Sequence, residues 1–589
     1  MSNLSDLKVL ALDCQATGAN PARGHLIEMG WIQTSASFTD NPAKSGVQDY
    51  LIRLPADAAI PRAVQRITGI SEESLKTAVS SKIAWDYLQK NAAEVAFANQ
   101  ETRCPVIVHF ARYEKPFLRD LHRQNCNASS FPLQVICTHE IAIRLLPDLP
   151  RRGIRAIAGY YGHSMPEFKR SADHAVATAL IWQKMVRLLN TTCSISKLGE
   201  LIDWLAATKA PPRSNRSFPM AAGLRRQLPD QPGIYRMLRA NGDLLYIGKA
   251  KSLKQRVNSY FRQKAPHAEH ILEMLTQARK LDVTLTGSAL QAAILESDEI
   301  KRHSPPYNIA LRRQHRQLAF FTKDLARQAT IAHKDYPVGP LPGAKTIEAL
   351  AAFGWWLKDG MQIADDYNDC IGYSVLALPP ECAPEIDCLK EGFKIFKQHH
   401  RSRLKNHAPL RFLTSLGARL WQERLEAAAL AETAEGQESN MDRIDSQQAV
   451  SGQEPVWTPE SVVGAIEGML RHAAYLIRRA RWFCMLSEST LAWTAPDKPA
   501  IKKTMLVFEK GNIFERAQIM TTAEIPTPPG FGKSFCARRG NIDLVTYDRL
   551  RVVTTELRRI IAEGRHVDLR LNPKVTLRRQ QLEKALRWV

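Results

Sequence analysis

The sequence predicts a multidomain protein of the α/β and α+β classes. Its 589 residues are too many for one hydrophobic core, because single cores stop growing at roughly 250–300 residues. Near the N-terminus, a short apolar run ends on Asp13 and leads through a small-residue turn to a second strand candidate, residues 25–32. In the middle of the chain, two tyrosine-bearing strand candidates flank Asn241-Gly242, which indicates a hairpin, and a basic helix is expected after Ser252 as its N-cap.

The composition is that of an ordinary folded protein with a basic surface. Hydrophobic residues make up 44%, charged residues 24%, and the net charge is +22. Such an excess of Lys and Arg favours a polyanionic partner such as DNA, although basic faces that are merely solvated are the alternative. The ten cysteines include no CxxC pair, which is typical of reduced thiols. No apolar run approaches the ~20 residues of a membrane span, and the N-terminus lacks a signal-peptide pattern, so we expect a cytoplasmic protein with no membrane partner.

The hairpin region carries the residues with the clearest chemistry. Tyr235 and Tyr246 supply phenols on adjacent strands, Arg256 and Tyr260 lie one helical turn apart, and Glu296 lies on a later apolar helix. Taken singly, each has a simpler interpretation as a packing tyrosine, a solvated cation or a surface acid. As a set, they resemble the GIY-YIG nuclease domain of the excision-repair endonuclease UvrC and its shorter relative Cho. The matched residues are Tyr235, Tyr246, Lys249, Arg256, Tyr260, Glu296 and Asn308.

The resemblance implies a small mixed sheet flanked by helices over residues 220–313 and a role for each matched residue. Glu296 would bind one Mg²⁺ or Mn²⁺, and Arg256 would hold the scissile phosphate. Tyr235 would act as the general base for the attacking water, or help to align that base. The base role requires Lys249, Arg256 or the metal to favour the phenolate. Tyr246, Lys249 and Tyr260 would orient the phosphate and the tyrosines, and Asn308 would fix the active-site turn.

Residues 1–200 carry a second, incomplete set of nuclease motifs. Asp13 at a strand end, the turn over residues 67–71, the block over 108–114 and the run over 175–179 resemble exonucleases of the DnaQ type, which have an RNase H-like fold. That family holds two magnesium ions with four acidic ligands. Here Gln15 replaces a glutamate and Glu114 an aspartate.

The third motif of this set is altered as well. His174 stands where the DnaQ-type family has an aspartate, Lys169 where it has a histidine, and Asp173 would serve only if its helix were re-registered. An amide, an imidazole and an ammonium do not offset the charge of two dications. The resemblance therefore implies a module that holds DNA, with Asp13 and Glu114 as the remaining metal ligands and weak 3′–5′ exonuclease activity. The alternative for Asp13 is a capping carboxylate at the strand end.

Composition predicts a polar, proline-containing linker at 201–219, a flexible linker at 429–456, and a C-terminal α+β domain of unrecognised role at 457–589. Residues 335–342 resemble the segment that follows the nuclease domain in UvrC and Cho, which implies a UvrC/Cho-like region at 314–428. Helices are expected at 344–357 and 548–564 and strands at 481–494 and 504–519. The basic stretch 390–407 is either a DNA-contacting helix or a solvated one. Cys370, Cys382 and Cys388 lie where relatives hold an iron–sulfur centre, but three thiols fall short of the usual four, so buried apolar cysteines are expected.

The function expected from these motifs is that of a metal-dependent DNA endonuclease in nucleotide excision repair. It would make a single incision in damaged duplex, as in Cho, after loading by a UvrB-like partner, since no counterpart of UvrC's second nuclease domain or helix–hairpin–helix module is recognised. Two alternatives remain open. One is a catalytically idle DNA-binding or scaffold protein. The other is a polymerase-associated 3′–5′ exonuclease with a vestigial endonuclease.

Overall fold

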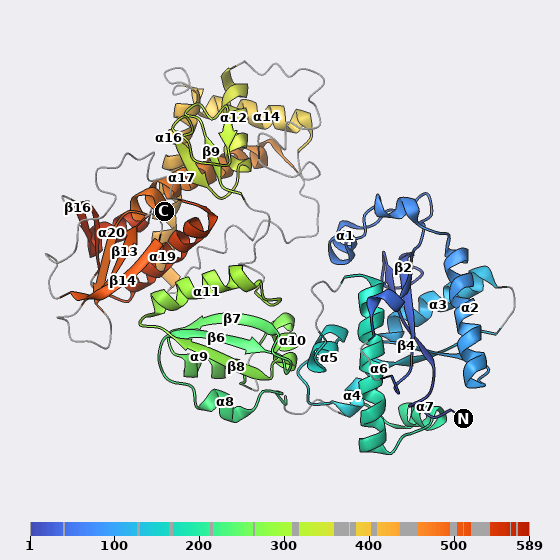
Figure 1. Ribbon diagram of the computed structural model, residues 1–589. Helices are drawn as coiled ribbons and strands as arrows, with labels where there is room; N and C mark the ends of the chain where they lie inside the picture. The colour runs from blue at the N-terminus through green and yellow to red at the C-terminus, as the bar shows by residue number, and fades with distance from the viewer. Residues whose placement is uncertain are drawn as a thin grey trace. The chain divides into compact units, whose positions relative to one another are not determined.

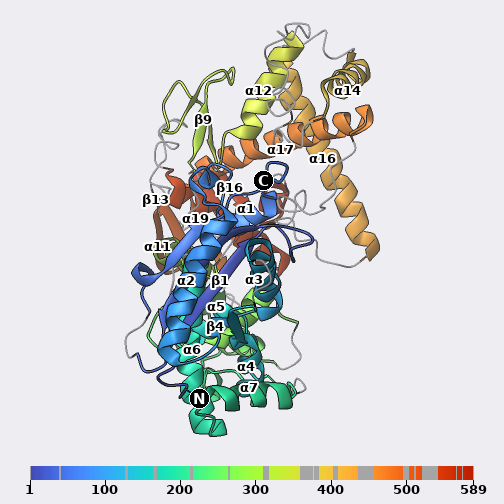
Figure 2. The same cartoon turned by 90° about the vertical axis from the view of Figure 1, so that its right-hand side faces the viewer.

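The computed structural model divides into two compact units, Met1–Ala292 with Arg302–Arg312 and Ala293–Lys301 with Arg313–Val589. Figures 1 and 2 give two views of it. The residues described are 2–38, 42–126, 130–163, 169–211, 216–262, 266–308, 317–358, 376, 384–401, 409–435, 457–494, 503–509, 512–519, 542–565, 567–572 and 575–587.

A five-stranded sheet of order β3-β2-β1-β4-β5 forms the N-terminal part of the first unit. Its strands are β1 (Val9–Ala16), β2 (Leu26–Thr34), β3 (Gln48–Leu51), β4 (Cys104–Val108) and β5 (Leu133–Cys137). β1, β2 and β3 pair antiparallel, whereas β4 is parallel to both β1 and β5. This mixed sheet agrees with the α/β class expected for the region.

Helices cover both faces of this sheet (Figure 1). On one face, Leu10 and Leu12 pack with α2 (Ser81–Asn99) and α3 (Ala111–Asn125). On the other, Val9 and Ala11 pack with α6 (Ser171–Cys193). Because side chains alternate along a strand, Asp13 shares the α6 face. The remaining elements are α1 (Arg62–Thr68), α4 (Thr138–Leu145), α5 (Ile154–Tyr160), α7 (Leu198–Ala207) and the short 3₁₀ helices Lys44–Gly46 and Ser74–Thr77.

A three-stranded sheet of order β7-β6-β8 follows in the same unit. It consists of β6 (Gly233–Leu238), β7 (Leu244–Ala250) and β8 (Lys280–Leu285). The helices of this region are α8 (Ala222–Arg226), α9 (Leu253–Ser259), α10 (Glu269–Gln277) and α11 (Ala289–His303), of which residues 293–301 belong to the second unit. Both strand pairs are antiparallel, so the expectation of a mixed sheet is wrong for the described strands. The chain passes through α9 and α10 after β7 and returns along the free edge of β6 in the opposite direction.

The second unit contains a helical part and a second large sheet. A small sheet of order β10-β9-β11 is formed by β9 (Ala319–Phe321), β10 (Gln328–Ala329) and β11 (Val338–Leu341). The helices α12 (Lys345–Lys358), α14 (Ile386–His399), α16 (Pro409–Glu435) and α17 (Pro459–Leu486) share one apolar core with it, which includes Phe353, Phe393 and Ile466. Figure 2 shows these helices together.

The C-terminal sheet has the order β14-β13-β12-β15-β16. Its strands are β12 (Thr490–Thr494), β13 (Lys503–Glu509), β14 (Asn512–Ile519), β15 (Val567–Asn572) and β16 (Val575–Arg578), and its helices are α19 (Leu544–Ala562) and α20 (Arg579–Leu586). The stretch of α11 that belongs to this unit is bound to α19 by two ion pairs. Lys301 lies 3.0 Å from Asp548 in a buried pair, and Arg549 lies 2.9 Å from Asp298.

Three sequence-based boundaries need correction. Residues 481–486, predicted as strand, are the last turns of α17 (Pro459–Leu486), where Trp482, Phe483 and Leu486 continue the buried face of the helix. The linker predicted from residue 429 is helical up to Glu435, and residues 436–456 lie outside the described part. The first domain, predicted to end at residue 200, continues through α7, whose Leu201 is buried in the N-terminal core.

Other predictions fall partly outside the described residues. Cys370, Cys382 and residues 402–408 are not among them, whereas Cys388 lies half-buried on α14 beside the apolar core. No helix in the described ranges is long and apolar enough to cross a membrane.

Candidate active site

The hairpin predicted around Asn241-Gly242 is present and aligns the two tyrosine-bearing segments. Tyr235 pairs with Gly248, and Met237 pairs with Tyr246. The Asn241 side chain accepts a hydrogen bond from the Asp243 amide at 3.1 Å, and Gly242 has a φ of +97° that favours glycine. Tyr235 and Tyr246 therefore lie on adjacent strands, as the sequence predicted.

Tyr235, Tyr246 and Tyr260 form a cluster over this hairpin. Their ring centroids lie 6.1 to 6.4 Å apart, and the hydroxyl oxygens of Tyr235 and Tyr260 are 2.9 Å apart. Tyr235 is fully buried and Tyr260 is 5% exposed. The cluster joins the strands to the helix α9.

Arg256 is attached to the same cluster. The Ser252 hydroxyl accepts from the Gln255 amide at 3.2 Å and caps α9, as expected, so Arg256 and Tyr260 fall one turn apart. The Arg256 guanidinium donates to the Tyr260 hydroxyl at 3.1 Å and lies 4.9 Å from that ring's centroid. The Arg256 side chain is exposed. A guanidinium held in this way presents a fixed cation at the edge of the tyrosine cluster.

Burial keeps Tyr235 in its neutral form. Loss of solvent is the largest cause that raises its pKa well above the usual value of 10, and the neighbouring Tyr260 and Tyr246 raise it further, while Arg256 opposes them. The phenol therefore donates or accepts hydrogen bonds at neutral pH and does not ionise. Of the two roles expected for Tyr235, this environment favours aligning the general base over acting as the base itself.

Two glycines of the motif make room for the cluster. A Cβ at Gly248 would lie 2.3 Å from the hydroxyl oxygen of Tyr235 and 2.8 Å from a ring carbon of Tyr246. A Cβ at Gly233 would lie 2.4 Å from the carbonyl oxygen of Thr284 on β8. The first glycine thus lets the tyrosines approach, and the second lets β8 pack against β6.

Asn308 fixes the strand beneath the cluster. It donates to the Ile247 carbonyl at 2.8 Å and accepts from the Ile247 amide at 2.9 Å. The hydrogen-bonding role expected for Asn308 is thus present, with β7 as its partner. His267 was not predicted, because it lies outside the motif: its Nε2 is 2.8 Å from the Tyr260 carbonyl oxygen and its ring stacks on Tyr260.

The two remaining residues of the predicted set lie on β7 and α11. Lys249 pairs with Ile234 and is half-buried. Glu296 is also half-buried, on the stretch of α11 that belongs to the second compact unit. The structure therefore brings Tyr235, Tyr246, Arg256 and Tyr260 together, with Asn308 in support.

Residues 231–309 match the family described as the UvrC-like GIY-YIG domain. Among curated relatives, the chain is 46% identical over 87 residues to UvrABC system protein C of Psychrobacter sp., over 15% of this chain and 14% of that protein. It is 38% identical over 134 residues to the protein of the same name from Idiomarina loihiensis, over 21% of each chain. The matches thus span about a fifth or less of these relatives.

Two kinds of solved structure match parts of the chain. The GIY-YIG domain of UvrC from Thermotoga maritima, bound to magnesium, is 31% identical over 15% of this chain and 100% of its own, with a TM-score of 0.14. Exonuclease X in complex with 5′ overhanging duplex DNA is 16% identical over 33% of this chain and 99% of its own, with a TM-score of 0.24. The expected UvrC-type GIY-YIG domain is thus confirmed for residues 231–309 by the family match.

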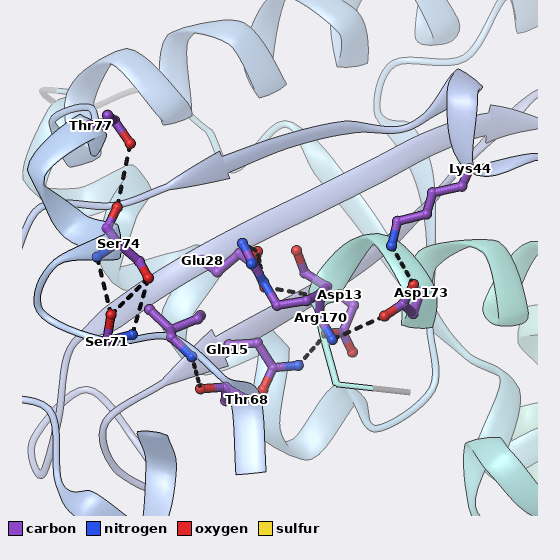
Figure 3. A network of polar contacts seen from close by, with 12 residues as sticks. Asp13, Gln15, Glu28, Lys44, Thr68, Ser71, Ser74, Thr77, Arg170 and Asp173 are labelled. Carbon is purple, nitrogen blue, oxygen red and sulfur yellow. Dashed lines mark hydrogen bonds and ion pairs between the residues drawn. The ribbon is translucent and has the colours of Figure 1, made fainter. Parts of the chain in front are cut away.

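The second candidate site, on the N-terminal sheet, is occupied by an internal polar network (Figure 3). The Gln15 side-chain amide donates to Asp13 at 2.8 Å, and the imidazole Nδ1 of His174 lies 3.2 Å from the other oxygen of Asp13. The two residues that replace acidic ligands thus contact the one ligand that is retained. No group of three or more His, Cys, Asp or Glu in the described ranges is placed to hold a metal ion.

The acidic residues around this network are engaged in other contacts or buried. Asp173 lies 2.7 Å from Lys44 and accepts from the Arg170 amide at the start of α6. Glu28, which the sequence did not single out, is fully buried and accepts from Arg170 Nε at 2.7 Å. Lys169 lies beside Gly69. Metal binding by Asp13 and Glu114 stays a prediction.

Proposed function

We propose that this chain is a metal-dependent DNA endonuclease that hydrolyses phosphodiester bonds with its GIY-YIG domain. The observation that carries the proposal is the cluster of the buried Tyr235 and Tyr260 with Tyr246 and the exposed Arg256, within the matched residues 231–309. A cluster used only for packing would not need a charged guanidinium hydrogen-bonded to its rim. The match to UvrC proteins further supports a role in nucleotide excision repair.

Each residue has a task in this proposal. Arg256 holds the scissile phosphate and offsets the charge that develops on it. The hydrogen-bonded pair Tyr235 and Tyr260 orients the attacking water. Glu296 offers a carboxylate, the ligand type that suits Mg²⁺ or Mn²⁺, and the bound metal would supply Lewis-acid activation of the water and the phosphoryl oxygen. Lys249 supplies a second cation for the phosphate.

The substrate and partner are proposed from the relatives. UvrABC system protein C is the name of the matched proteins, so damaged duplex DNA is the expected substrate and a UvrB-like protein the expected loader. The N-terminal domain is proposed to have the RNase H-like fold and to hold DNA. Its strand order supports the fold, and the contacts of Gln15 and His174 with Asp13 support low exonuclease activity.

Nicking of end-labelled damaged duplex with Mg²⁺ or Mn²⁺, with and without a UvrB-like loader, tests the proposal. We expect Glu296→Ala to abolish nicking, because no other matched residue offers a hard ligand for the cation. Glu299→Ala removes a carboxylate one turn away on the same helix and serves as the matched control. Undiminished nicking by Glu296→Ala would refute the assignment. DNA binding without cleavage by the wild type would favour the idle scaffold protein instead.

The same gels address the N-terminal domain. We expect 3′–5′ degradation of single strands to be weak and unaffected by Asp13→Ala. Robust degradation that depends on Asp13 would show a working exonuclease and overturn this part of the proposal.

A further inference from the structure

One face of α3 carries a stripe of cations that lines a groove. Arg112, Lys115, Arg119 and Arg123 recur at helical spacing, and the opposite face of α3 is buried against the N-terminal sheet. The groove has a volume of about 670 Å³, and its other wall is formed by residues Asn20, Pro21 and Ala22 of the β1–β2 connection. Four cations therefore line the groove against one carboxylate, Asp120.

The cations are largely uncompensated. Asp120 accepts a hydrogen bond from Gln124 at 2.7 Å and lies 3.9 Å from Arg123. Among the described residues, none forms an ion pair with Arg112, Lys115 or Arg119. Arg119 instead lies 5.9 Å from the ring centroid of Phe131. Three like charges along one helix face repel one another, so the groove favours an anionic ligand.

The other wall is locally ordered. The Asn20 side chain accepts from the Ala22 amide at 3.1 Å, and the Arg23 amide donates to the Asn20 carbonyl oxygen at 3.0 Å. This connection follows directly from β1, which carries Asp13, and α3 also carries Glu114 on its buried face. The groove is therefore built from the two elements that hold the retained acidic positions of the exonuclease-like site.

The dimensions of the groove suit a single strand of nucleic acid. The cations from Arg112 to Arg123 span about 16 Å of helix, which is long enough for several consecutive phosphates. The groove has a volume of about 670 Å³, which gives the backbone of one strand room to lie along the cations. Proteins that hold single strands without sequence preference use a positively charged groove of this kind.

We propose that the α3 groove, lined by Arg112, Lys115, Arg119 and Arg123, binds the phosphate backbone of single-stranded DNA. This deepens the proposed function, on which it rests, by assigning a DNA-holding surface to the N-terminal domain. The groove holds a single strand beside a site in which Asp13 is already engaged by Gln15 and His174. The N-terminal domain thus holds a single strand while the GIY-YIG domain acts on the DNA.

Binding is measured with the full chain in EDTA by fluorescence polarisation, using a labelled single-stranded oligonucleotide and the blunt duplex of the same sequence over a series of salt concentrations. The triple variant R112A/K115A/R119A removes the three cations. Each phosphate contact contributes about 0.7 to the slope of log Kobs against log salt for single strands, so we expect the slope to fall by about 2. At low salt, affinity for the single strand should fall at least about tenfold, with a smaller loss for the duplex.

The control triple K90A/R103A/R187A removes the same charge from exposed positions of the same domain outside the groove. It should leave the slope for the single strand within experimental error of wild type. An equal loss of affinity and salt slope in both triple variants would mean that the groove acts only through the net charge of the domain. That result would refute the proposal. A loss confined to the duplex, or none at all, would refute it as well. The proposed endonuclease function is tested by a different result, because nicking by Glu296→Ala would refute it whatever the binding measurements show.

Discussion

Glu114 is a buried carboxyl whose surroundings disfavour its charge. Its side chain is 3% exposed, and its Oε2 has no hydrogen-bond partner among the described residues. Burial is the first cause that raises its pKa well above the usual 4.5, and the charge of Asp13 is the second. When folding raises the pKa of a group, that group contributes its full stabilisation only at pH values below its pKa in the unfolded state. That contribution is lost as the pH rises through the folded pKa.

Glu114→Gln is therefore expected to stabilise the protein at neutral and alkaline pH. The amide keeps the shape of the neutral acid and removes the cost of a buried charge, which is on the order of 1 kcal/mol or more. Thermal unfolding of the full chain should show a higher midpoint for the variant at pH 8 and no difference near pH 4.5, the unfolded value. The opposite result, a variant less stable than wild type at pH 8, would mean that the ionised carboxylate has a partner. If Mg²⁺ raises the midpoint of wild type only, that partner is a metal ion.

At the scale of single residues, the spacing of residues within a short stretch of sequence was enough to predict most of the site. Tyr235, Tyr246, Arg256 and Tyr260 were predicted because a hairpin and one helical turn bring them together within a short stretch of chain. Pairs distant in sequence gave no such signal. Glu28 and Arg170 are 142 residues apart, and only the packing of β2 against α6 makes them partners.

At the scale of elements, the tyrosine cluster on the hairpin of β6 and β7 depends on the absence of a side chain at Gly248. Gly248→Ala would place a Cβ 2.3 Å from the Tyr235 hydroxyl, so the Tyr235–Tyr260 hydrogen bond must lengthen or break. We expect a loss of nicking rate of about tenfold or more, because misplacement of an aligning group by about 1 Å costs up to about a hundredfold. Binding of uncleaved duplex in EDTA should stay within twofold of wild type, since the strands still pair. Wild-type nicking by Gly248→Ala would show that the tyrosine geometry is irrelevant to the reaction.

The errors in element prediction have physical causes. The run of apolar and aromatic residues at 481–486 was taken for a strand, because a short apolar run does not separate strand from helix. In the structure it completes the 28-residue helix α17, whose buried residues Trp482, Phe483 and Leu486 continue the helical face begun near Val462. Residues 429–435 were assigned to a linker because the stretch 429–456 has few apolar residues, but Ala and Glu are strong helix formers and extend α16.

At the largest scale that the structure describes, α5 of the N-terminal domain packs on α10 of the GIY-YIG domain within the first unit. Arg151 lies 2.7 Å from Glu269, and its amide donates to the Thr276 hydroxyl at 3.0 Å. Gly159 permits the closest approach: a Cβ there would lie 1.8 Å from the side-chain oxygen of Gln277. Gln277 is itself fully buried and accepts from Arg239 Nε at 3.0 Å. The two domains thus share a buried polar contact, and neither motif in the sequence indicated it.

Gly159→Ala is expected to loosen this contact. The added methyl forces Gln277 to move and lengthens or breaks its hydrogen bond with Arg239 Nε, at a cost of about 1–3 kcal/mol. Hydrogen exchange of the full chain should show faster exchange of the α10 amides, and calorimetry a lower unfolding midpoint for the first unit. Gly223→Ala is the matched control, because no atom lies within 4 Å of its added Cβ, and it should leave α10 exchange unchanged. Identical exchange of α10 in both variants would mean that the nuclease and exonuclease-like domains fold as independent bodies. In that case a strand held in the α3 groove would not be presented to the tyrosine cluster in a fixed orientation.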